Sequence, residues 1–146
     1  MSQDHVGRPF AELESAYEAT LYRVLGDLPA VLAVADPAGM HDRWLARHGS
    51  RSAVVVTAWN PFSEPTDEAS NEQANARLRR SIEQHRLRVA AAQNGDPSGD
   101  WSEDGFCVFD LPDALLDAWL VEHRQHAALR LTQHESPRLV WHPCHR

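Results

Sequence analysis

The chain has 146 residues, of which 42% are hydrophobic and 24% are charged, a length and composition typical of one globular domain. Its 21 acidic and 14 basic side chains give a formal net charge of −7, which argues against a general nucleic-acid-binding protein, because such proteins need a basic surface. All 14 basic residues are arginines, so Schiff-base chemistry and the standard phosphate-binding P-loop, which need lysine, are excluded.

The sequence contains no recognisable targeting or membrane segment. The first ten residues carry charged side chains and no apolar stretch, unlike a signal peptide. The longest nearly apolar run, Ala30–Ala35, is far too short to cross a bilayer. The two cysteines, Cys107 and Cys144, do not make a disulfide framework and predict reduced thiols. We therefore expect a cytoplasmic protein with no membrane partner.

Hydrophobic periodicity divides the first part of the chain into two helices and three strands. The predicted elements are a helix with Phe10, Leu13 and Tyr17 on one face, strands over 20–25 and 31–35 joined by a turn over 26–29, a helix from 36 to 48, and a strand over 53–58. Asp36 and Pro37 open the second helix, which ends before Gly49. This helix is expected to bury Met40, Trp44 and Leu45. The almost wholly apolar run at 53–58 indicates a central strand covered on both faces.

The second part of the chain continues the alternation of helices and strands. The predicted elements are a helix ending near Arg86, strands over 87–92 and 106–109 joined by a polar loop over 94–104, a helix opened by residues 110–113, and strands over 127–131 and 138–141. Ser70 and Gln73 form a capping box that would start the first of these helices, although Thr66 or Asp67 would cap it a turn earlier.

Between residues 53 and 131 the order strand–helix–strand–strand–helix–strand is typical of a split-βαβ, ferredoxin-like core. We therefore predict an α+β protein with a mostly antiparallel sheet, helices packed on one face of it, and an N-terminal hairpin and helix added. Residues 1–146 are expected to form a single domain, with flexible tails at 1–8 and 142–146.

A first group of candidate functional residues lies at the end of the predicted central strand. Its members are Thr57, Trp59, Asn60, Asn71 and Asn75. Pro61 pushes Asn60 toward an extended conformation, and the two later asparagines, four residues apart, share one face of the next helix near its start. A helix N-terminus suits an anion or a polar ligand. The simpler interpretation is that these residues cap the helix and tie down the loop.

A second group lies in the predicted polar loop at 94–104. Its members are Asp96, Asp100, Trp101 and Glu103. Asn94, Asp96 and Ser98 match the first ligand positions of a calcium loop, but Gly105 stands where the bidentate Glu is required. Two interpretations remain. The loop is either a polar connection built from turn-forming residues, or it presents its acids over the first group as ligands or as a general base.

No metal site and no cofactor are expected. His123 and His126, and the histidines at 142–145, do not have the spacing of a zinc site. The chain has no G-x-G-x-x-G and no H-E-x-x-H motif. Gly95–Gly99 is not a G-x-S-x-G nucleophile motif, because the strand-to-helix context is missing. A hydrolase of a familiar class is therefore not expected.

The sequence resembles a bacterial family catalogued as domain of unknown function 3293. The matching residues are the string Ser52–Ser63 with its Thr-Ala-Trp-Asn-Pro core, Asn71, Asn75, Asp96–Glu103 with Gly99 and Trp101, Gln125–Ala127 and Arg138–Val140. The family often has Ser where this chain has Gly105, and a Phe-Gly-Gln-like turn where this chain has His123–Gln125. The resemblance implies no reaction, but it draws attention to the same two groups of residues.

We predict a small soluble binding or regulatory domain for a polar or anionic small ligand. The ligand would lie between the Thr57–Ser63 corner and the Asp96–Glu103 loop, with Trp59 and Trp101 as flat walls. Two alternatives stay open. One is an enzyme in which a loop carboxylate with a raised pKa acts as general base. The other is a protein-interaction module anchored by exposed tryptophans, so the partner is either a small molecule or a protein.

Overall fold

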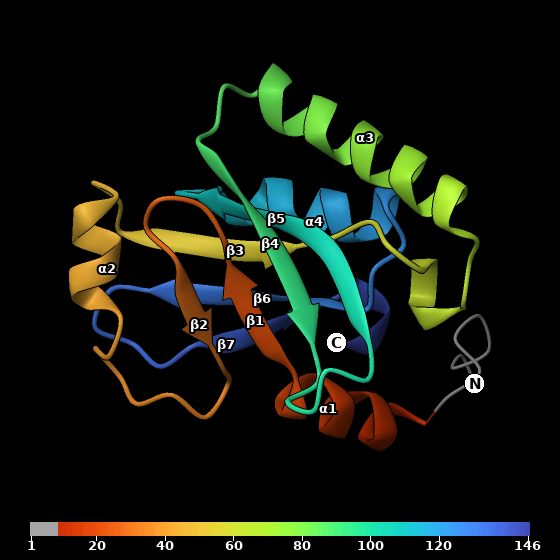
Figure 1. The fold of residues 1–146 in the computed structure, drawn as a ribbon, viewed down its shortest axis with the longest axis horizontal. Helices are drawn as coiled ribbons and strands as arrows, with labels where there is room; N and C mark the ends of the chain where they lie inside the picture. Colours follow the sequence, from red (N-terminus) through yellow and green to blue (C-terminus); the bar gives the residue numbers. More distant parts are fainter. Residues whose placement is uncertain (1–8) are drawn as a thin grey trace.

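In the computed structural model, which describes residues 9–146, seven antiparallel strands form one sheet in the order β2–β1–β4–β5–β3–β6–β7 (Figure 1). The predicted tail at 1–8 lies outside the described residues. The strands are β1 (Leu21–Val24), β2 (Ala30–Leu32), β3 (Ser52–Val56), β4 (Val89–Gly95), β5 (Ser102–Phe109), β6 (Ala127–Thr132) and β7 (Arg138–Trp141). Helices and an antiparallel sheet make the protein α+β, as the sequence predicts.

The helices are α1 (Phe10–Ala19), α2 (Asp42–Arg47), α3 (Glu68–Gln84) and α4 (Asp113–Glu122), with 3₁₀ turns η2 (Pro61–Ser63) and η3 (Pro143–His145). Of the alternative caps for α3, Asp67 is the one used, because its carboxylate accepts a hydrogen bond from the Ser70 amide at 3.0 Å. The chain leaves the helix through Arg86, whose φ of 56° is left-handed.

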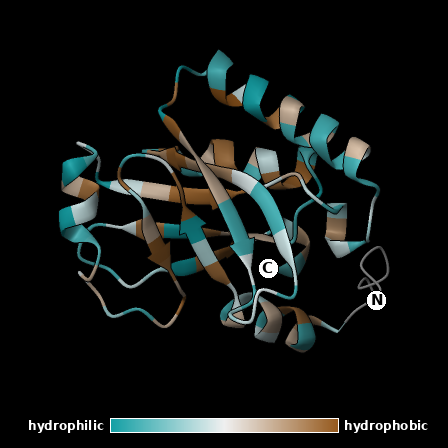
Figure 2. Ribbon diagram, viewed as in Figure 1, coloured by the Kyte–Doolittle hydropathy of each residue, from teal (hydrophilic) through white to brown (hydrophobic). Residues whose placement is uncertain are grey.

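Helices α3 and α4 cover one face of the sheet. The core on this side contains Leu78 and Ile82 from α3, Leu116, Trp119 and Leu120 from α4, and Val54, Val56 and Val108 from the strands beneath them. Figure 2 shows α3 as mainly hydrophilic, while β3 is largely hydrophobic. The helix is amphipathic because its apolar residues recur every three or four positions, at Ala74, Leu78 and Ile82.

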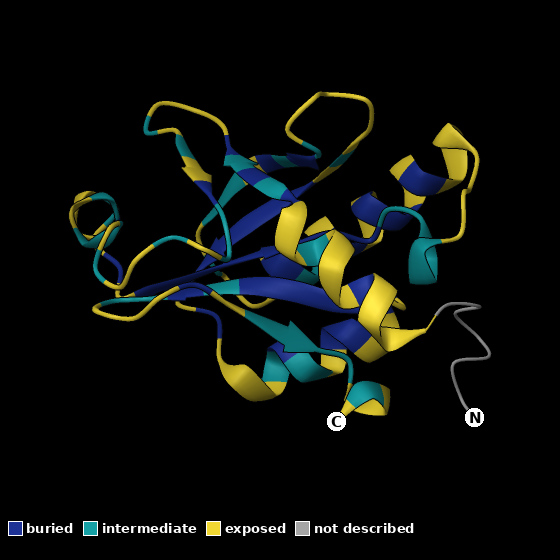
Figure 3. Ribbon diagram, turned by 90° about the horizontal axis from the view of Figure 1, so that it is seen from below, coloured by how far each residue is buried: buried dark blue, intermediate teal, exposed yellow. Residues whose placement is uncertain are grey.

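The opposite face of the sheet is concave. Tyr22 and Val24 of β1 belong to the same core cluster as Leu129 and Leu131 of β6, although β4, β5 and β3 lie between these strands in the sheet. The cluster also contains Ala92, Cys107 and Val55 of the strands between them, so one continuous core follows the curled sheet from β1 to β6 (Figure 1). The middle strands in Figure 3 are accordingly buried, while the helices expose their outer sides. Because α2 packs Leu45 on this second cluster, the prediction of helices on one face only is wrong.

The prediction of a helix opened by Asp36 is also wrong. The Asp36 carboxylate accepts a hydrogen bond from the Ala33 amide at 2.9 Å and contacts the His41 ring at 2.7 Å, so it closes a turn instead of capping a helix. Helix α2 starts only at Asp42, and Met40, predicted to be buried, is 59% exposed.

The hairpin of β4 and β5 extends further than the sequence indicates. Its pairing runs from Val89 opposite Val108 to Gly95 opposite Ser102, so both ends of the predicted loop at 94–104 are strand and only residues 96–101 connect them. The sequence pattern ends each strand where its apolar residues end, whereas the backbone ladder continues through polar positions. The remaining turn is closed by Asp96, whose carboxylate accepts a hydrogen bond from the Trp101 amide at 3.1 Å.

The closing residues 142–146, predicted as a flexible tail, form a 3₁₀ turn with defined contacts. The His142 ring accepts a hydrogen bond from the Cys144 amide at 2.9 Å, and the Arg146 guanidinium pairs with Asp117 of α4 at 2.7 Å. This ion pair holds the end of the chain on α4. Within residues 9–146, no helix has the length and apolar character needed to cross a membrane.

Candidate functional site

A cavity of about 420 Å³ opens at one end of the concave face, where α1 and the β4–β5 turn meet the corner after β3. Figure 1 shows α1 beside the β4–β5 turn at this end of the sheet. The lining residues are Ala16, Tyr17 and Thr20 from the α1 segment, Tyr22 from β1, Val55, Thr57, Asn60, Ser63 and Pro65 from β3 and its corner, Asn94, Trp101, Ser102 and Glu103 from the hairpin, and Ala127 from β6. The volume lies within the range of roughly 300–1,000 Å³ typical of small-molecule sites.

Three polar side chains form a row across the floor of the cavity. Tyr22 of β1 lies opposite Asn94 of β4, and Asn94 lies opposite Glu103 of β5. Side chains directly opposite each other in paired strands project from the same face. Because Tyr22 belongs to the concave core cluster, all three project into the concave side. We call these residues the Tyr22–Asn94–Glu103 row.

Asn94 is the most unusual member of the row. Its side chain is only 6% exposed, and its Oδ1 atom has no hydrogen-bond partner within the described part of the chain. Most buried polar atoms in proteins are hydrogen-bonded, and leaving one unsatisfied costs about 1–3 kcal/mol. Asn94 is also one of the residues that line the cavity, so its amide group is a candidate partner for a ligand.

Glu103 lies at the end of the row. Burial raises its pKa from 4.5 to about 7, and a hydrogen bond from the Asn60 side chain only partly opposes this rise. Burial disfavours the charged carboxylate because the protein interior solvates it less well than water does. Burial also raises the pKa of the Tyr22 phenol, so this hydroxyl stays neutral at physiological pH. Glu103 is therefore the residue of the row that changes charge near neutrality.

Aromatic side chains form the walls of the cavity. Tyr17 and Tyr22 lie on the side of α1 and β1, and Trp101 lies on the side of the hairpin. Trp101 is 43% exposed, although a large aromatic ring usually buries more of its surface. A ligand in the cavity would contact this ring and bury part of it.

The corner after β3 has an unusual backbone. Asn60, Phe62 and Ser63 all have positive φ angles, of 44°, 51° and 64°, which non-glycine residues rarely adopt. The predicted extended conformation of Asn60 is therefore wrong. Asn71 holds this corner: its Oδ1 accepts the Asn60 amide at 2.8 Å, and its Nδ2 donates to Asn60 Oδ1 at 2.8 Å and to the Thr66 carbonyl at 3.2 Å.

Asn75 fastens β3 to β5 below the corner. Its Oδ1 accepts the Ala58 amide at 2.9 Å, and its Nδ2 donates to the Asp104 carbonyl at 2.9 Å. The Thr57 hydroxyl donates to the same carbonyl at 2.6 Å. We call Thr57, Asn60, Asn71 and Asn75 the corner network. The hydrogen bonds of Asn71 and Asn75 are made to the protein itself, which fits the simpler interpretation of these two residues as ties for the loop.

Gly105 lets the end of β3 approach β5. A β-carbon at this position would lie 2.7 Å from the Val56 carbonyl oxygen and 3.0 Å from Thr57 Cβ. Both distances are shorter than van der Waals contact allows. A side chain at position 105 would therefore clash with the end of β3.

The structure separates the sequence-predicted site residues into two sets. Those that line the cavity are Thr57, Asn60, Trp101 and Glu103, and those that do not are Trp59, Asn71, Asn75, Asp96 and Asp100. Hydrogen bonds from Ser98 and Trp101 hold the pKa of Asp96 below its ordinary value, so this exposed carboxylate is unsuited to act as a base near pH 7.

The predicted site residues do not include six polar or aromatic residues of the cavity: Tyr17, Thr20, Tyr22, Ser63, Asn94 and Ser102. A signal for two of them exists in the alternation of the strands. Tyr22 is in phase with buried Val24, and Asn94 is in phase with buried Ala92, so both belong to the inward face.

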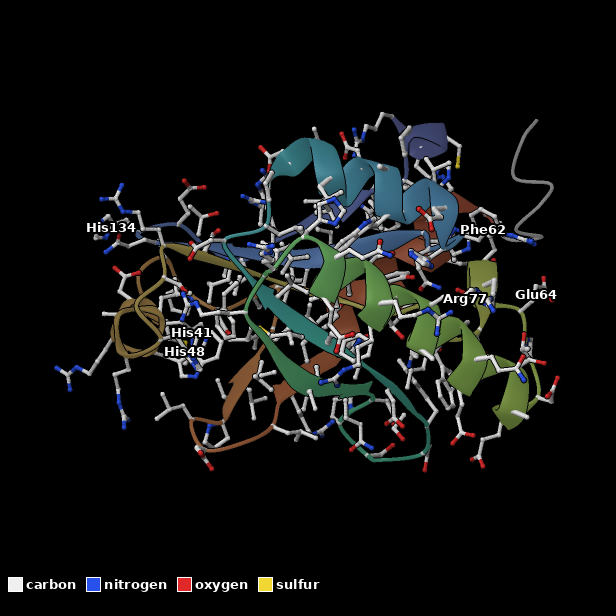
Figure 4. All side chains as sticks on the ribbon, turned by 90° about the horizontal axis from the view of Figure 1, so that it is seen from above. His41, His48, Phe62, Glu64, Arg77 and His134 are labelled. Atoms are coloured by element: carbon white, nitrogen blue, oxygen red, sulfur yellow. The ribbon has the colours of Figure 1, made fainter. Side chains whose placement is uncertain are left out.

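No histidine is among the residues that line the cavity. His41 and His48, labelled in Figure 4, lie at the end of the molecule opposite to Phe62. Phe62 in turn contacts the ring of His126, with ring centres 5.2 Å apart. In residues 9–146 there is no group of three or more His, Cys, Asp or Glu side chains that could hold a metal ion.

One family model, described as protein of unknown function (DUF3293), matches residues 56–128, which is half of the chain. The chain belongs to this family. The matched segment of the family contains Asn94, Glu103, Trp101 and the corner network, whereas Tyr17 and Tyr22 lie before it. Searches of curated proteins and of solved structures found no match.

Proposed function

We propose that this member of the family is a binding domain for a small polar molecule, held in the cavity between α1, the β3 corner and the β4–β5 hairpin. The observation that carries the proposal is the Tyr22–Asn94–Glu103 row: a buried acceptor that has no partner within residues 9–146, beside a largely buried carboxyl group, in a cavity of about 420 Å³. Natural folds rarely retain such groups without a use, because each one destabilises the folded state.

The surroundings of the row support the same function. Trp101 and Tyr17 give the cavity flat apolar walls, and a few convergent polar groups set the orientation of a ligand. The corner network makes one wall rigid, because Asn71 and Asn75 tie the strained corner to α3. A rigid wall lowers the entropy cost of binding.

The alternative in which the protein is an enzyme is supported by one observation, the pKa of Glu103 near 7. A general base works best when its pKa is close to the working pH, and Glu103 is the only acid of the predicted loop that meets this condition while lining the cavity. In this alternative, Asn94 would orient the substrate and Glu103 would accept its proton. The test is turnover of a bound compound that Glu103→Gln abolishes without weakening its binding.

The proposed scaffold for the site is a split-βαβ core formed by β3, α3, β4, β5, α4 and β6. The strand order β4–β5–β3–β6, with each helix joining strands that have one strand between them, supports this arrangement. The cavity would then lie on the face of the core that α3 and α4 leave uncovered, which the added β1, β2 and α1 enclose.

The binding function can be tested with a thermal-shift screen of neutral, cationic and anionic metabolites, on the wild type and on a variant with a filled cavity. Ala16→Phe places a ring in the cavity from an exposed helix position, and Ala19→Phe, on the same helix but outside the lining, is its control. A ligand at 100 times its Kd stabilises the fold by about 2.7 kcal/mol. We expect compounds that stabilise the wild type and Ala19→Phe but not Ala16→Phe. Stabilisation that persists in Ala16→Phe would place the ligand elsewhere and contradict the proposal.

A further inference from the structure

The floor of the cavity is rich in hydrogen-bond acceptors. Glu103 contributes a carboxyl group, and Asn94 contributes an Oδ1 atom that accepts no hydrogen bond within the described residues. The two residues lie directly opposite each other on β4 and β5, so their β-carbons are about 4.5–5.5 Å apart. A single small group can therefore contact both side chains.

Three of the hydroxyl groups that line the cavity donate their protons to the backbone. Thr57 donates to the Asp104 carbonyl at 2.6 Å, Thr20 donates to the Ala16 carbonyl at 2.8 Å, and Tyr22 donates to the Tyr17 carbonyl at 3.3 Å. Each of these hydroxyls then presents only its lone pairs to a ligand.

The described residues give the lining no positive charge. Among residues 9–146, those that line the cavity include no arginine and no histidine, and the chain has no lysine. The titratable groups facing Glu103 are Tyr22 from β1 and Tyr17 from α1, with the Asn60 amide as a neutral donor. An anion in this cavity would meet a carboxyl group and several lone pairs without a compensating cation, which is electrostatically unfavourable.

From this arrangement we infer that the ligand carries a cationic nitrogen group, of the amidinium, guanidinium or ammonium class, which donates hydrogen bonds to the Glu103 carboxylate and to Asn94 Oδ1. This inference rests on the proposed binding function and specifies its ligand. A planar amidinium or guanidinium fits best, because one pair of its N–H groups matches a carboxylate while another N–H reaches a neighbouring acceptor. The rest of the ligand lies between Tyr17 and Trp101.

Binding of such a cation is coupled to the charge of Glu103. With the cavity empty, burial keeps the pKa of Glu103 near 7, so part of the protein carries a neutral carboxylic acid at physiological pH. A bound cation favours the ionised form, and binding therefore releases a proton. Affinity for the cation rises as the pH increases through about 7 and becomes constant above it.

The experiment uses three probes of the same ring and nearly the same size: benzamidine, benzamide and benzoate, which are cationic, neutral and anionic. Each is titrated into the full chain at pH 8 and followed by the amide and indole NMR signals of Asn94 and Trp101. Glu103→Gln and Asn94→Leu test the two acceptors. Glu18→Gln, which removes a carboxylate from an exposed position of α1 outside the lining, is the matched control.

We expect benzamidine to bind more tightly than benzamide, and benzoate to bind least. Glu103→Gln should weaken benzamidine about 10- to 100-fold and remove the pH dependence of its Kd. Glu18→Gln should change neither property. Benzoate or benzamide binding in the cavity as tightly as benzamidine would overturn the inference and leave the binding function standing. Failure of all three probes to shift the Asn94 and Trp101 signals would contradict both.

Discussion

Two groups of polar side chains border the same cavity, and they differ in how their hydrogen bonds are satisfied. In the corner network, Asn71 and Asn75 form hydrogen bonds of 2.8–3.2 Å with backbone groups of the corner and of β5 and with the Asn60 side chain. In the Tyr22–Asn94–Glu103 row, Asn94 has a buried acceptor that has no partner in the described part of the chain, and partial burial of Glu103 raises its pKa to about 7. The comparison teaches that buried polar residues of one site serve different ends: the first group holds the wall, and the second is available to a ligand.

The difference has consequences for stability. A satisfied buried amide stabilises the fold, because removing it leaves its backbone partners without hydrogen bonds. An unsatisfied buried group destabilises the fold, and removing it relieves that cost. Substitutions in the two groups should therefore change the free energy of unfolding in opposite directions.

The largest effect is expected for the corner network. Asn75→Ala leaves the Ala58 amide buried without an acceptor and the Asp104 carbonyl without one of its donors. The free energy of unfolding should fall by about 3 kcal/mol, measured by urea denaturation. Gln73→Ala, an exposed change on the same helix, should have an effect within about 0.5 kcal/mol. A similarly small effect of Asn75→Ala would mean that the network does not hold the wall.

The second effect is the pH dependence that Glu103 gives to the empty protein. The folded-state pKa of Glu103, about 7, lies above its ordinary value of 4.5, so the folded protein binds more protons than the unfolded chain in this window. The contribution of Glu103 to stability is therefore fully present below pH 4.5 and is lost as the pH rises through 7. Glu103→Gln should abolish this fall and be about 2–3 kcal/mol more stable than the wild type at pH 8.

Urea denaturation of the wild type and of Glu103→Gln at pH 5 and at pH 8 measures this pH-dependent contribution of Glu103 to the free energy of unfolding. The carboxyl groups with lowered pKa values, such as Asp42 and Asp117, lose their contribution only in acid, below this window. An equal difference between wild type and Glu103→Gln at the two pH values would show that Glu103 does not titrate near neutrality.

A decrease of about 2 kcal/mol in the free energy of unfolding is expected for a substitution at Gly105, which lies between the corner network and the Tyr22–Asn94–Glu103 row. Gly105→Ser forces the new β-carbon against the Val56 carbonyl, so β3 and β5 must move apart. The free energy of unfolding should decrease, and the amide signals of Thr57 and Asp104 should shift in the NMR spectrum. Gly26→Ser is an informative contrast, because no atom lies within 4 Å of its β-carbon position, and only its positive φ of 98° opposes the change.

The smallest effect has the opposite sign. Asn94→Leu replaces the unsatisfied amide by an apolar side chain of similar size, and it should stabilise the empty protein by about 1 kcal/mol. The same variant should bind benzamidine more weakly than the wild type. Thermal denaturation and titration together measure both changes. A loss of stability would mean that Asn94 has a structural role like that of Asn75.

Much of the fold can be predicted from local sequence patterns. The apolar run at 53–58 identifies β3, because a strand covered on both faces has no polar alternation. Leu78 and Ile82 identify the inner face of α3 by their spacing. The wrong prediction of a helix at Asp36 is equally local in origin. Asp36 and Pro37 match a helix start, but the Asp36 carboxylate accepts a hydrogen bond from the Ala33 amide and closes a turn.

The candidate site is less accessible to sequence reasoning. Trp101 and Glu103 are predictable as site residues because they lie in a segment rich in acids and turn residues. Tyr22 lies some 80 positions earlier in the chain, so no local pattern connects it to them. The register that places Tyr22 beside Asn94, and Asn94 beside Glu103, depends on which strands become neighbours. Single-strand periodicity gives the face of a residue but not its neighbour on the next strand.

The sequence by itself therefore determined most of the helices and strands, the α+β class, the absence of lysine chemistry and two of the chain segments around the site. The tertiary structure alone decided which polar side chains of those segments find hydrogen-bond partners. Asn71, Asn75 and Asn94 are the same residue type, and all three are buried. Two of them find backbone partners across the β3 corner, while the third faces the cavity, because hydrogen bonding depends on what long-range folding brings within about 3 Å.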